Sequence, residues 1–201
     1  KTVLSNPSFK KAFSNTIHIW LFNFVPQIGL ALLLTAWFTD KRYHIRGEGL
    51  FKVLFYMPNI ITAATIAILF NALLGYPMGP VNDIFMRLGI SKEPINFLVD
   101  KSVARGTVEF IQFWMWYGYT MIILISGVMG INPELFESAE VDGANRIQTF
   151  FYIMMKLCKP VATTVVIMET IWAWNAFMLP LVLTLNNPSS RTLAVGLYAF
   201  K

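Results

Sequence analysis

Side chains that could do chemistry are few in this chain, and they are scattered. The histidines are His18 and His44, which lie in different predicted elements and have no partner at metal-ligand spacing. Cys158 is the single cysteine, so it can form no internal disulfide and has no second thiol for a metal; we predict a packing role. The motifs G-x-x-x-x-G-K-[ST], H-E-x-x-H and G-x-S-x-G are absent. The sequence therefore predicts no catalytic set, no metal site and no cofactor, and the protein is not expected to be an enzyme.

An unusual polar segment occupies residues 132–146 and reads NPELFESAEVDGANR. Asn132 can cap a helix, and Pro133 suits its first turn. Gly143 can end that helix because glycine readily adopts positive φ, and a second helix is expected to start near Asn145. A short helix with a small-residue face and a sharp corner would suit docking to a cytoplasmic partner. An ordinary helical loop explains the same residues equally well.

A second unusual residue is Glu169, the one charged residue between Lys159 and Ser190. If a membrane span begins near residue 161, Glu169 lies roughly 12 Å inside it, at 1.5 Å per residue. An ionisable side chain at that depth is a functional candidate. It could equally be the partner of a polar group on a neighbouring helix.

The composition places these residues in a membrane protein. The 201 residues are 56% hydrophobic, 15% aromatic and 13% charged. A soluble domain carries about 25% charged residues, and a disordered chain few aromatic ones, so both classes are excluded. Charge-free stretches long enough to cross a hydrocarbon core of about 30 Å predict four transmembrane helices. They cover roughly residues 14–38, 51–74, 107–129 and 161–185.

Charge in the loops predicts the orientation. The short loop between the first two spans holds Lys41, Arg42, Arg46 and Lys52, and positive loops face the cytoplasm. Alternation then places residues 75–106 outside and 130–160 inside. We read the net charge of +5 as this loop bias, with no role in binding nucleic acid. The loops are too short to fold alone, so residues 1–201 are expected to form a single transmembrane domain.

The spacing within the 132–146 segment resembles a known signature. Glu137-Ser138-Ala139, three residues, Gly143, nine residues and Ile153 are similar to the EAA motif of binding-protein-dependent ABC importer permeases. Ser138 replaces the second alanine, and Met155-Lys156 stand where Leu-Pro is usual, so Pro160 is expected to supply the bend one turn later. Further motifs resemble the sugar-importer (maltose/glycerol-phosphate-like) branch: N-T at 15–16, F-Y-M-P at 55–58, G-P-V-N at 79–82, W-N-A-F at 174–177, P-L at 180–181 and R-T-L-A-V-G-L at 191–197.

The resemblance implies an all-α integral membrane fold, a polytopic helical bundle of the type I ABC importer permease kind. Four spans are present of an expected six, so one helix before Lys1 and one after Lys201 are expected. The front half resembles the first maltose-type permease, whereas residues 174–197 also resemble the second.

The implied function is that of a permease subunit forming half of a translocation pore for ATP-driven import of a carbohydrate or similar polar solute. Its implied partners are separate ATP-binding subunits, a second permease, an extracytoplasmic solute-binding protein and the lipid bilayer of a bacterial or archaeal plasma membrane. By the same carry-over, the residues that couple to the ATPase are Glu137, Ser138, Ala139, Asp142, Gly143 and Ala144.

Candidates for the solute path are Glu169, Trp172, Asn175 and Tyr117, because aromatic faces stack on sugar rings and amides bond hydroxyls. Aromatic residues also form interfacial belts and pack helices, so that interpretation stays open. A competing function is a stand-alone channel or an ion-gradient-driven secondary transporter. Glu169 alone makes no charge relay, which counts against that alternative. A membrane-embedded enzyme lacks any assembled catalytic set.

Overall fold

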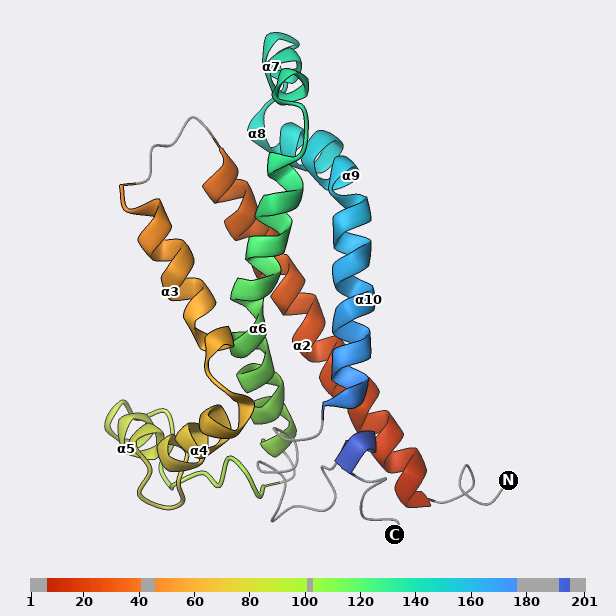
Figure 1. Cartoon of the computed structure of the whole chain (residues 1–201). Coiled ribbons are helices and arrows are strands. Elements are labelled where there is room, and N and C mark those ends of the chain that lie inside the picture. The colour runs from red at the N-terminus through yellow and green to blue at the C-terminus, as the bar shows by residue number, and fades with distance from the viewer. Residues whose placement is uncertain (1–6, 41–45, 101–102, 177–191, 196–201) are drawn as a thin grey trace. The chain divides into compact units, whose positions relative to one another are not determined.

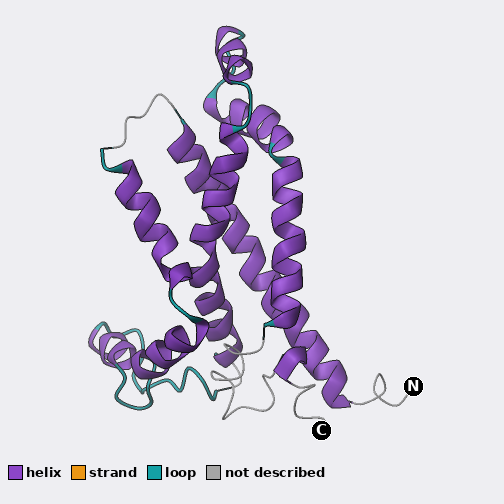
Figure 2. Cartoon of the chain, in the orientation of Figure 1, coloured by secondary structure: helices purple, strands orange, loops and turns teal. Residues whose placement is uncertain are grey.

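The computed structural model describes residues 7–40, 46–100, 103–176 and 192–195, and all extended regular structure among them is helical (Figures 1 and 2). In chain order the elements are α2 (Pro7–Thr39), α3 (Glu48–Ile60), α4 (Ala63–Leu73), α5 (Pro80–Arg87), α6 (Ala104–Met129), α7 (Pro133–Val141), α8 (Arg146–Gln148), the π-helix η1 (Thr149–Met154), α9 (Met155–Leu157) and α10 (Lys159–Asn175).

Two of these helices are individually long and apolar enough to cross a membrane, over Phe9–Thr39 and Ala104–Met129. Two further candidates are helix pairs bent at a short break: Glu48–Ile60 with Ala63–Leu73 by 93°, and Arg146–Leu157 with Lys159–Asn175 by 65°. The described part of the chain therefore holds two spans, or up to four if each bent pair is one span. Residues 177–185 of the last expected span lie outside the described residues.

The segment 51–74, expected as one helix, consists of two. The backbone leaves the helical region at Thr62, where φ is −63° and ψ is 145°. The Thr62 hydroxyl accepts a hydrogen bond from the Thr65 backbone N–H at 3.3 Å and so caps α4. Pro58 is within α3, so it neither opens that helix nor ends it. The break between α3 and α4 therefore lies at a threonine cap, which the long apolar stretch in the sequence did not indicate.

The bend expected at Pro160 is confirmed. The helices on either side of Cys158 are inclined by 65°, and Pro160 occupies the first turn of α10. Proline is tolerated there because its missing N–H would have no partner in the first turn of a helix.

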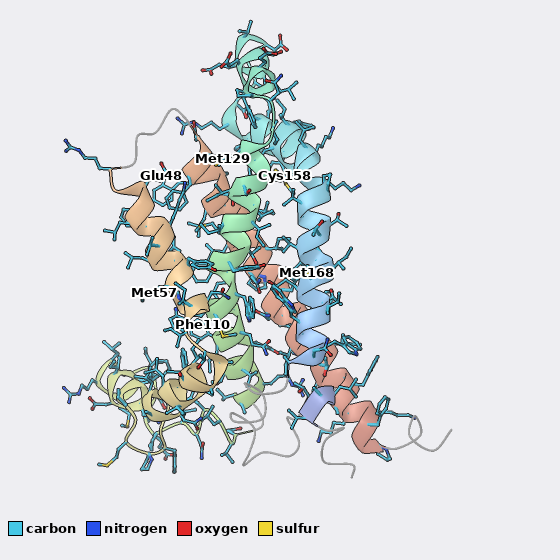
Figure 3. All side chains as sticks on the ribbon, viewed as in Figure 1. Glu48, Met57, Phe110, Met129, Cys158 and Met168 are labelled. Carbon is cyan, nitrogen blue, oxygen red and sulfur yellow. The ribbon has the colours of Figure 1, made fainter. Side chains whose placement is uncertain are left out.

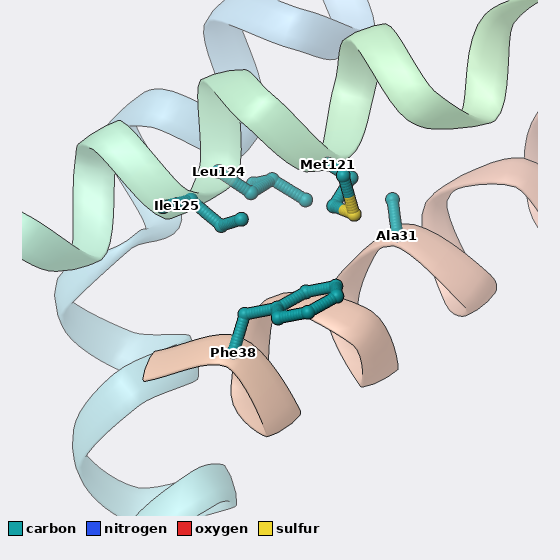
Figure 4. Packing of buried hydrophobic residues seen from close by; sticks show 5 residues of the cluster. All are labelled: Ala31, Phe38, Met121, Leu124 and Ile125. Carbon is teal, nitrogen blue, oxygen red and sulfur yellow. The ribbon is translucent and has the colours of Figure 1, made fainter. Parts of the chain in front are cut away.

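The described residues belong to two compact units. Within the described residues, the first comprises 7–24, 61–100, 103–113, 171–176 and 192–195, and the second comprises 25–40, 46–60 and 114–170. The second unit has a core in which α2 meets α6 (Figure 4). The partly buried Phe55, Val161 and Ala162 pack against it. The buried members of this core are Ala31, Phe38, Met121, Leu124 and Ile125.

Two glycines of α6 permit close helix packing in this second unit. A Cβ placed on Gly118 would lie 1.9 Å from the backbone oxygen of Phe55, so α6 and α3 touch backbone to backbone. A Cβ on Gly127 would lie 2.9 Å from Cγ2 of Val161 on α10. Small residues at such positions let membrane helices approach closely, because van der Waals packing must supply much of their association energy.

In the first unit, a buried asparagine organises the chain between α4 and α6. Asn82 is 1% exposed; its Nδ2 donates to the Ile95 carbonyl at 3.0 Å, and its Oδ1 accepts from the Ile95 N–H at 2.8 Å. At Gly79 a Cβ would lie 2.5 Å from backbone atoms of Gly75. The G-P-V-N motif at 79–82 therefore folds this loop.

Two further sequence motifs, N-T at 15–16 and R-T-L-A-V-G-L at 191–197, are in contact in the first unit. The Thr16 hydroxyl donates to the Ala12 carbonyl at 3.1 Å and accepts from the Leu193 N–H at 2.8 Å, across 177 positions of sequence. Thr16 and Leu193 are both buried. The N-T motif at 15–16 is thereby joined to the described part of the motif at 191–197.

Gly118→Ala should destabilise the protein, because its methyl group would collide with backbone and not with a side chain that could move. We expect a loss of at least about 1–3 kcal/mol, the usual cost of overpacking. The loss of stability would be measured by heating the protein in detergent and quantifying, by size-exclusion chromatography, the fraction that remains folded at each temperature. Gly106→Ala is the matched control on the same helix, since a Cβ there meets nothing within 4 Å. Equal stability of the two variants would contradict the close contact.

Candidate functional site

The 132–146 segment begins as a capped helix. The Asn132 Oδ1 accepts from the Glu134 N–H at 3.1 Å, and Pro133 is the first residue of α7. Both features were predicted. A carboxylate at Glu134 is favourable here because the N-terminal end of a helix carries partial positive charge.

The corner after α7 is held by backbone hydrogen bonds. Gly143 has a φ of +77°. Its N–H donates to the Glu140 carbonyl at 3.1 Å, and the Ala144 N–H donates to the Ala139 carbonyl at 2.9 Å. This pair of bonds is a Schellman motif, which needs a left-handed residue at the glycine position. The prediction that Gly143 ends the helix is confirmed.

A second cap follows at once. The Asn145 side chain accepts from the Gln148 N–H at 2.9 Å, and the Gln148 side chain accepts from the Asn145 N–H at 2.8 Å. This reciprocal pair is a capping box, and it starts α8 at the place that the sequence predicted. Helix, corner and following helix are thus joined by short-range bonds that leave little freedom between them.

The base of α7 is anchored to longer helices of the same unit. Phe136 packs against a buried cluster formed by Val128 of α6, Met154 of η1 and Cys158, which lies between α9 and α10. Figure 3 labels Cys158. Arg146 pairs with Asp40, just after α2, at 3.8 Å between Nε and Oδ2. The segment from α7 to α8 is therefore in contact with α2, α6 and η1. Cys158, predicted as a packing residue, is 2% exposed in this cluster.

The six predicted coupling residues differ in exposure. Glu137, Ser138, Asp142 and Gly143 are exposed and Ala144 is partly buried, whereas Ala139 is only 7% exposed and faces the rest of the chain. Val141, which sequence reasoning missed, is 87% exposed at the tip of α7. The corner also forms one wall of a hollow of about 330 Å³, lined by Asp142, Gly143, Ala144, Gln148, Tyr152 and Ile153. Folding thus brings the spaced Ile153 beside the Gly143 corner.

Glu169 lies in a buried hydrogen-bonded cluster of three helices. It is 5% exposed, and its Oε1 accepts from Gln27 Nε2 at 2.9 Å and from the Thr120 hydroxyl at 3.4 Å. Gln27 Nε2 also donates to Thr120 Oγ1 at 2.8 Å, and both residues are fully buried. Glu169 therefore links α10 to α2 and α6, which agrees with its interpretation as the partner of a polar group on a neighbouring helix. The sequence signal for Gln27 was an amide within an apolar stretch, and it was missed.

The other candidates for the solute path are divided between the two units. Tyr117 is half-buried and lies edge-on to Phe55, with 6.1 Å between ring centroids. Trp172 is half-buried, and Asn175 is exposed with its Nδ2 donating to the Ile171 carbonyl at 2.8 Å. Tyr117 belongs with Glu169 to the second unit, whereas Trp172 and Asn175 belong to the first.

A contact between two polar side chains of the first unit was also missed. His18 Nδ1 lies 2.8 Å from Glu109 Oε1, and the imidazole stacks on Phe22 with 4.3 Å between ring centroids. No sequence spacing could have paired residues of α2 and α6. His44 lies outside the described residues. Among the described residues, no group of three or more His, Cys, Asp or Glu side chains could hold a metal ion.

Apolar helices of membrane-spanning length, with helix-breaking turns between them, define a polytopic helical membrane protein. Residues 5–200 match the family "Binding-protein-dependent transport system inner membrane component". The chain belongs to that family.

Curated relatives have corresponding names. The chain is 28% identical over 196 residues to a "Probable ABC transporter permease protein YurN" of Bacillus subtilis, covering 98% of this chain and 67% of the relative. It is 27% identical to the "Lactose transport system permease protein LacF" of Rhizobium radiobacter (98% and 65%) and to the "Arabinooligosaccharides transport system permease protein AraP" of B. subtilis (92% and 58%). The chain thus spans between 58% and 67% of the length of these relatives.

Solved structures show the same fold. A chain of a bacterial ABC transporter that imports the acidic polysaccharide alginate matches with a TM-score of 0.83 at 21% identity, covering 99% of this chain and 70% of that one. A bacterial alginate transporter in complex with an alginate pentasaccharide-bound periplasmic protein matches with a TM-score of 0.84 at 22% identity, covering 99% and 68%. The predicted all-helical permease fold is confirmed.

Glu169→Gln should leave stability and solute uptake close to wild type, because a glutamine oxygen can still accept from Gln27 and Thr120. Glu169→Ala should lower the free energy of unfolding by about 1–3 kcal/mol, since it leaves buried donors without an acceptor. Thermal unfolding and uptake into proteoliposomes would be measured on both variants. A Glu169→Gln protein of normal stability that no longer transports would show that the charge itself is used.

Proposed function

We propose that this protein is a permease subunit of an ATP-driven importer, in which it forms half of the translocation pore. Its place would be the plasma membrane of a bacterium or archaeon, which it crosses several times. One observation carries the proposal: an exposed helix, α7, ends in a rigid Gly143 corner and is anchored on helices of the span region. Family membership and the names of the relatives support it.

The geometry of α7 supports a proposed coupling mechanism. Exposed Glu137, Ser138 and Asp142 would enter a groove on a separate ATP-binding subunit, a helix-in-groove contact. The Schellman corner and the Phe136 anchor would then pass rigid-body motion of α7 into η1, α9 and α10. Ala139, being buried, would contribute by letting α7 lie close to its own chain. Gly143 and Ala144 would hold the corner that transmits the motion.

ATP hydrolysis is assigned to the partner subunits, so this chain would not itself be an enzyme. A second permease would complete the pore, and an extracytoplasmic solute-binding protein would deliver the solute. The alginate transporter solved with a periplasmic binding protein supports such an assembly by its likeness in fold.

The solute is proposed to be a carbohydrate or a similar polar molecule. The relatives named for lactose and arabinooligosaccharides support this class. Tyr117, Trp172 and Asn175 are kept as the candidates for solute contact. For Glu169 we propose a positioning role, because its carboxylate is buried and hydrogen-bonded to Gln27 and Thr120.

A stand-alone channel or an ion-gradient-driven transporter is the alternative. A gradient-driven carrier would need titratable or ion-binding groups placed in sequence across the membrane. The partners described for Glu169 are a neutral amide and a neutral hydroxyl, which does not favour a relay.

Glu137→Lys should weaken recovery of the ATP-binding subunit with the tagged full-length protein and lower uptake at least about tenfold, a change of ~1.4 kcal/mol in coupling. The reason is that a reversed charge would enter the proposed docking groove. Glu93→Lys changes another exposed glutamate, in the loop after α5; it is the matched control and should transport normally. Uptake that follows an ion gradient and needs no ATP-binding subunit would establish the alternative function.

Gly143→Val should uncouple ATP hydrolysis from transport, because the left-handed φ costs a branched residue roughly 1–2 kcal/mol and distorts the corner. Gly89→Val is the control: its φ is +71° and a Cβ meets nothing within 4 Å at either glycine, so the local strain is similar. Both variants would be purified with the ATPase, and stimulated hydrolysis and uptake compared. Equal uptake by the Gly143→Val and Gly89→Val variants would contradict the coupling role proposed for the Gly143 corner.

A further inference from the structure

The short helix α5 has an outward face that is half apolar and half charged. Inward, Asn82 is fully buried and Phe85 packs edge-on against Phe97 at 5.7 Å. Outward, Ile84 and Leu88 are 51% and 69% exposed and share one side at i, i+4 spacing. The neighbouring side carries an ion pair, with Arg87 Nε 2.9 Å from Asp83 Oδ1.

Further exposed apolar side chains flank the helix. Met78 is 91% exposed just before α5, and Ile90 is 63% exposed just after it. We refer to these two residues, together with Ile84 and Leu88, as the α5 apolar surface; all four are exposed within residues 78–90. Contiguous exposed apolar side chains on a folded protein mark contact with another protein or with a membrane.

The chain holds α5 close to the membrane boundary. Only residues 74–79 separate α5 from α4, and six residues reach at most roughly 20 Å. On the other side, Phe97 packs on α5 and lies seven positions before Ala104, the first residue of α6. At 1.5 Å per residue the 26 residues of α6 are longer than a hydrocarbon core of about 30 Å, so its first turn lies near the lipid headgroups.

We propose that α5 is an interfacial helix, whose α5 apolar surface lies in the headgroup and upper acyl region of the bilayer while the Asp83–Arg87 pair faces water. A helix with adjacent apolar and charged faces lies in the interface plane in this way. Exposed Tyr76, in the loop before α5, fits the amphipathic aromatic residues of that zone.

The composition of the surface favours lipid over a protein partner. Its members are aliphatic or methionine side chains: Met78, Ile84, Leu88 and Ile90. Energetically dominant protein contacts are instead rich in Trp, Tyr and Arg and poor in Leu. Arg87, the one arginine on α5, already pairs with Asp83 on the same helix. The charged side of α5 therefore does not require an acidic residue from a partner protein.

Site-specific fluorescence would test the proposal on the full-length protein in its assembled transporter. The native cysteine is removed as Cys158→Ala, and single cysteines Leu88→Cys and, as matched control on the same helix, Asp83→Cys are labelled with an environment-sensitive fluorophore. The complexes are reconstituted in bilayers with or without lipids that carry a nitroxide near the headgroup. Aqueous iodide is the second quencher.

The label at position 88 should emit at shorter wavelength than the label at position 83, and lipid nitroxide should quench it several-fold more strongly. Quenching of position 88 by iodide, with no preference for lipid nitroxide, would overturn the proposal in favour of a water-exposed surface. Protection of position 88 from both quenchers would overturn it in favour of a contact with the second permease or the binding protein. None of these readouts depends on transport, so they separate this inference from the proposed function.

Discussion

The hydrocarbon interior of a bilayer offers no hydrogen-bond partners, and this constraint governs the structure from its helices to its buried polar groups. Every backbone amide within a span must be satisfied inside the chain, which allows helices and leaves little room for other backbone forms. Polar side chains in the same region must find one another. Gln27, Thr120 and Glu169 do so across three helices, with Gln27 Nε2 bonded to both partners. These hydrogen bonds join α2, α6 and α10 to one another.

Where helices stop, specific caps take over the unsatisfied backbone groups. Thr62 caps α4, Asn132 caps α7, and Asn145 caps α8. Each cap is a local device, so the chain can turn sharply without leaving a helix end unpaired. The segment after α6 holds three such devices between Asn132 and Gln148: the Asn132 cap, the Gly143 corner and the Asn145 capping box. Such local restraint would suit the coupling role that we propose for this segment.

Close approach of helices depends on glycine in the second unit. At Gly118 the α6 backbone meets the α3 backbone, and at Gly127 it meets the Val161 side chain. Lipid tails are as apolar as the side chains, so the hydrophobic effect does little to hold helices together within the bilayer. Dispersion forces between closely packed atoms of the two helices contribute instead. Two contacts on one helix leave α6 as the central packing surface of this unit, with α2 completing the core through Phe38.

Sequence by itself determined the features that arise from neighbours along the chain. Apolar stretches predicted membrane helices, Asn132 and Gly143 predicted where α7 begins and ends, and Pro160 predicted a bend. In each case the residues that cause the feature lie within one or two helical turns of it, so the sequence alone indicates it. The break at Thr62 was missed although it is local. A threonine in an apolar stretch can lie within a helix or cap one, and only its backbone angles distinguish the two.

Only the tertiary structure decided which distant residues meet. Glu169 was visible as an oddity in the sequence, but its partners Gln27 and Thr120 depend on which faces of three helices turn toward each other. The pairing of His18 with Glu109 and the burial of Ala139 have the same origin. Helical periodicity constrains which residues share a face, whereas the choice of facing helix depends on packing energy summed over many contacts. That sum exists only in the folded chain, and no local pattern of residues encodes it.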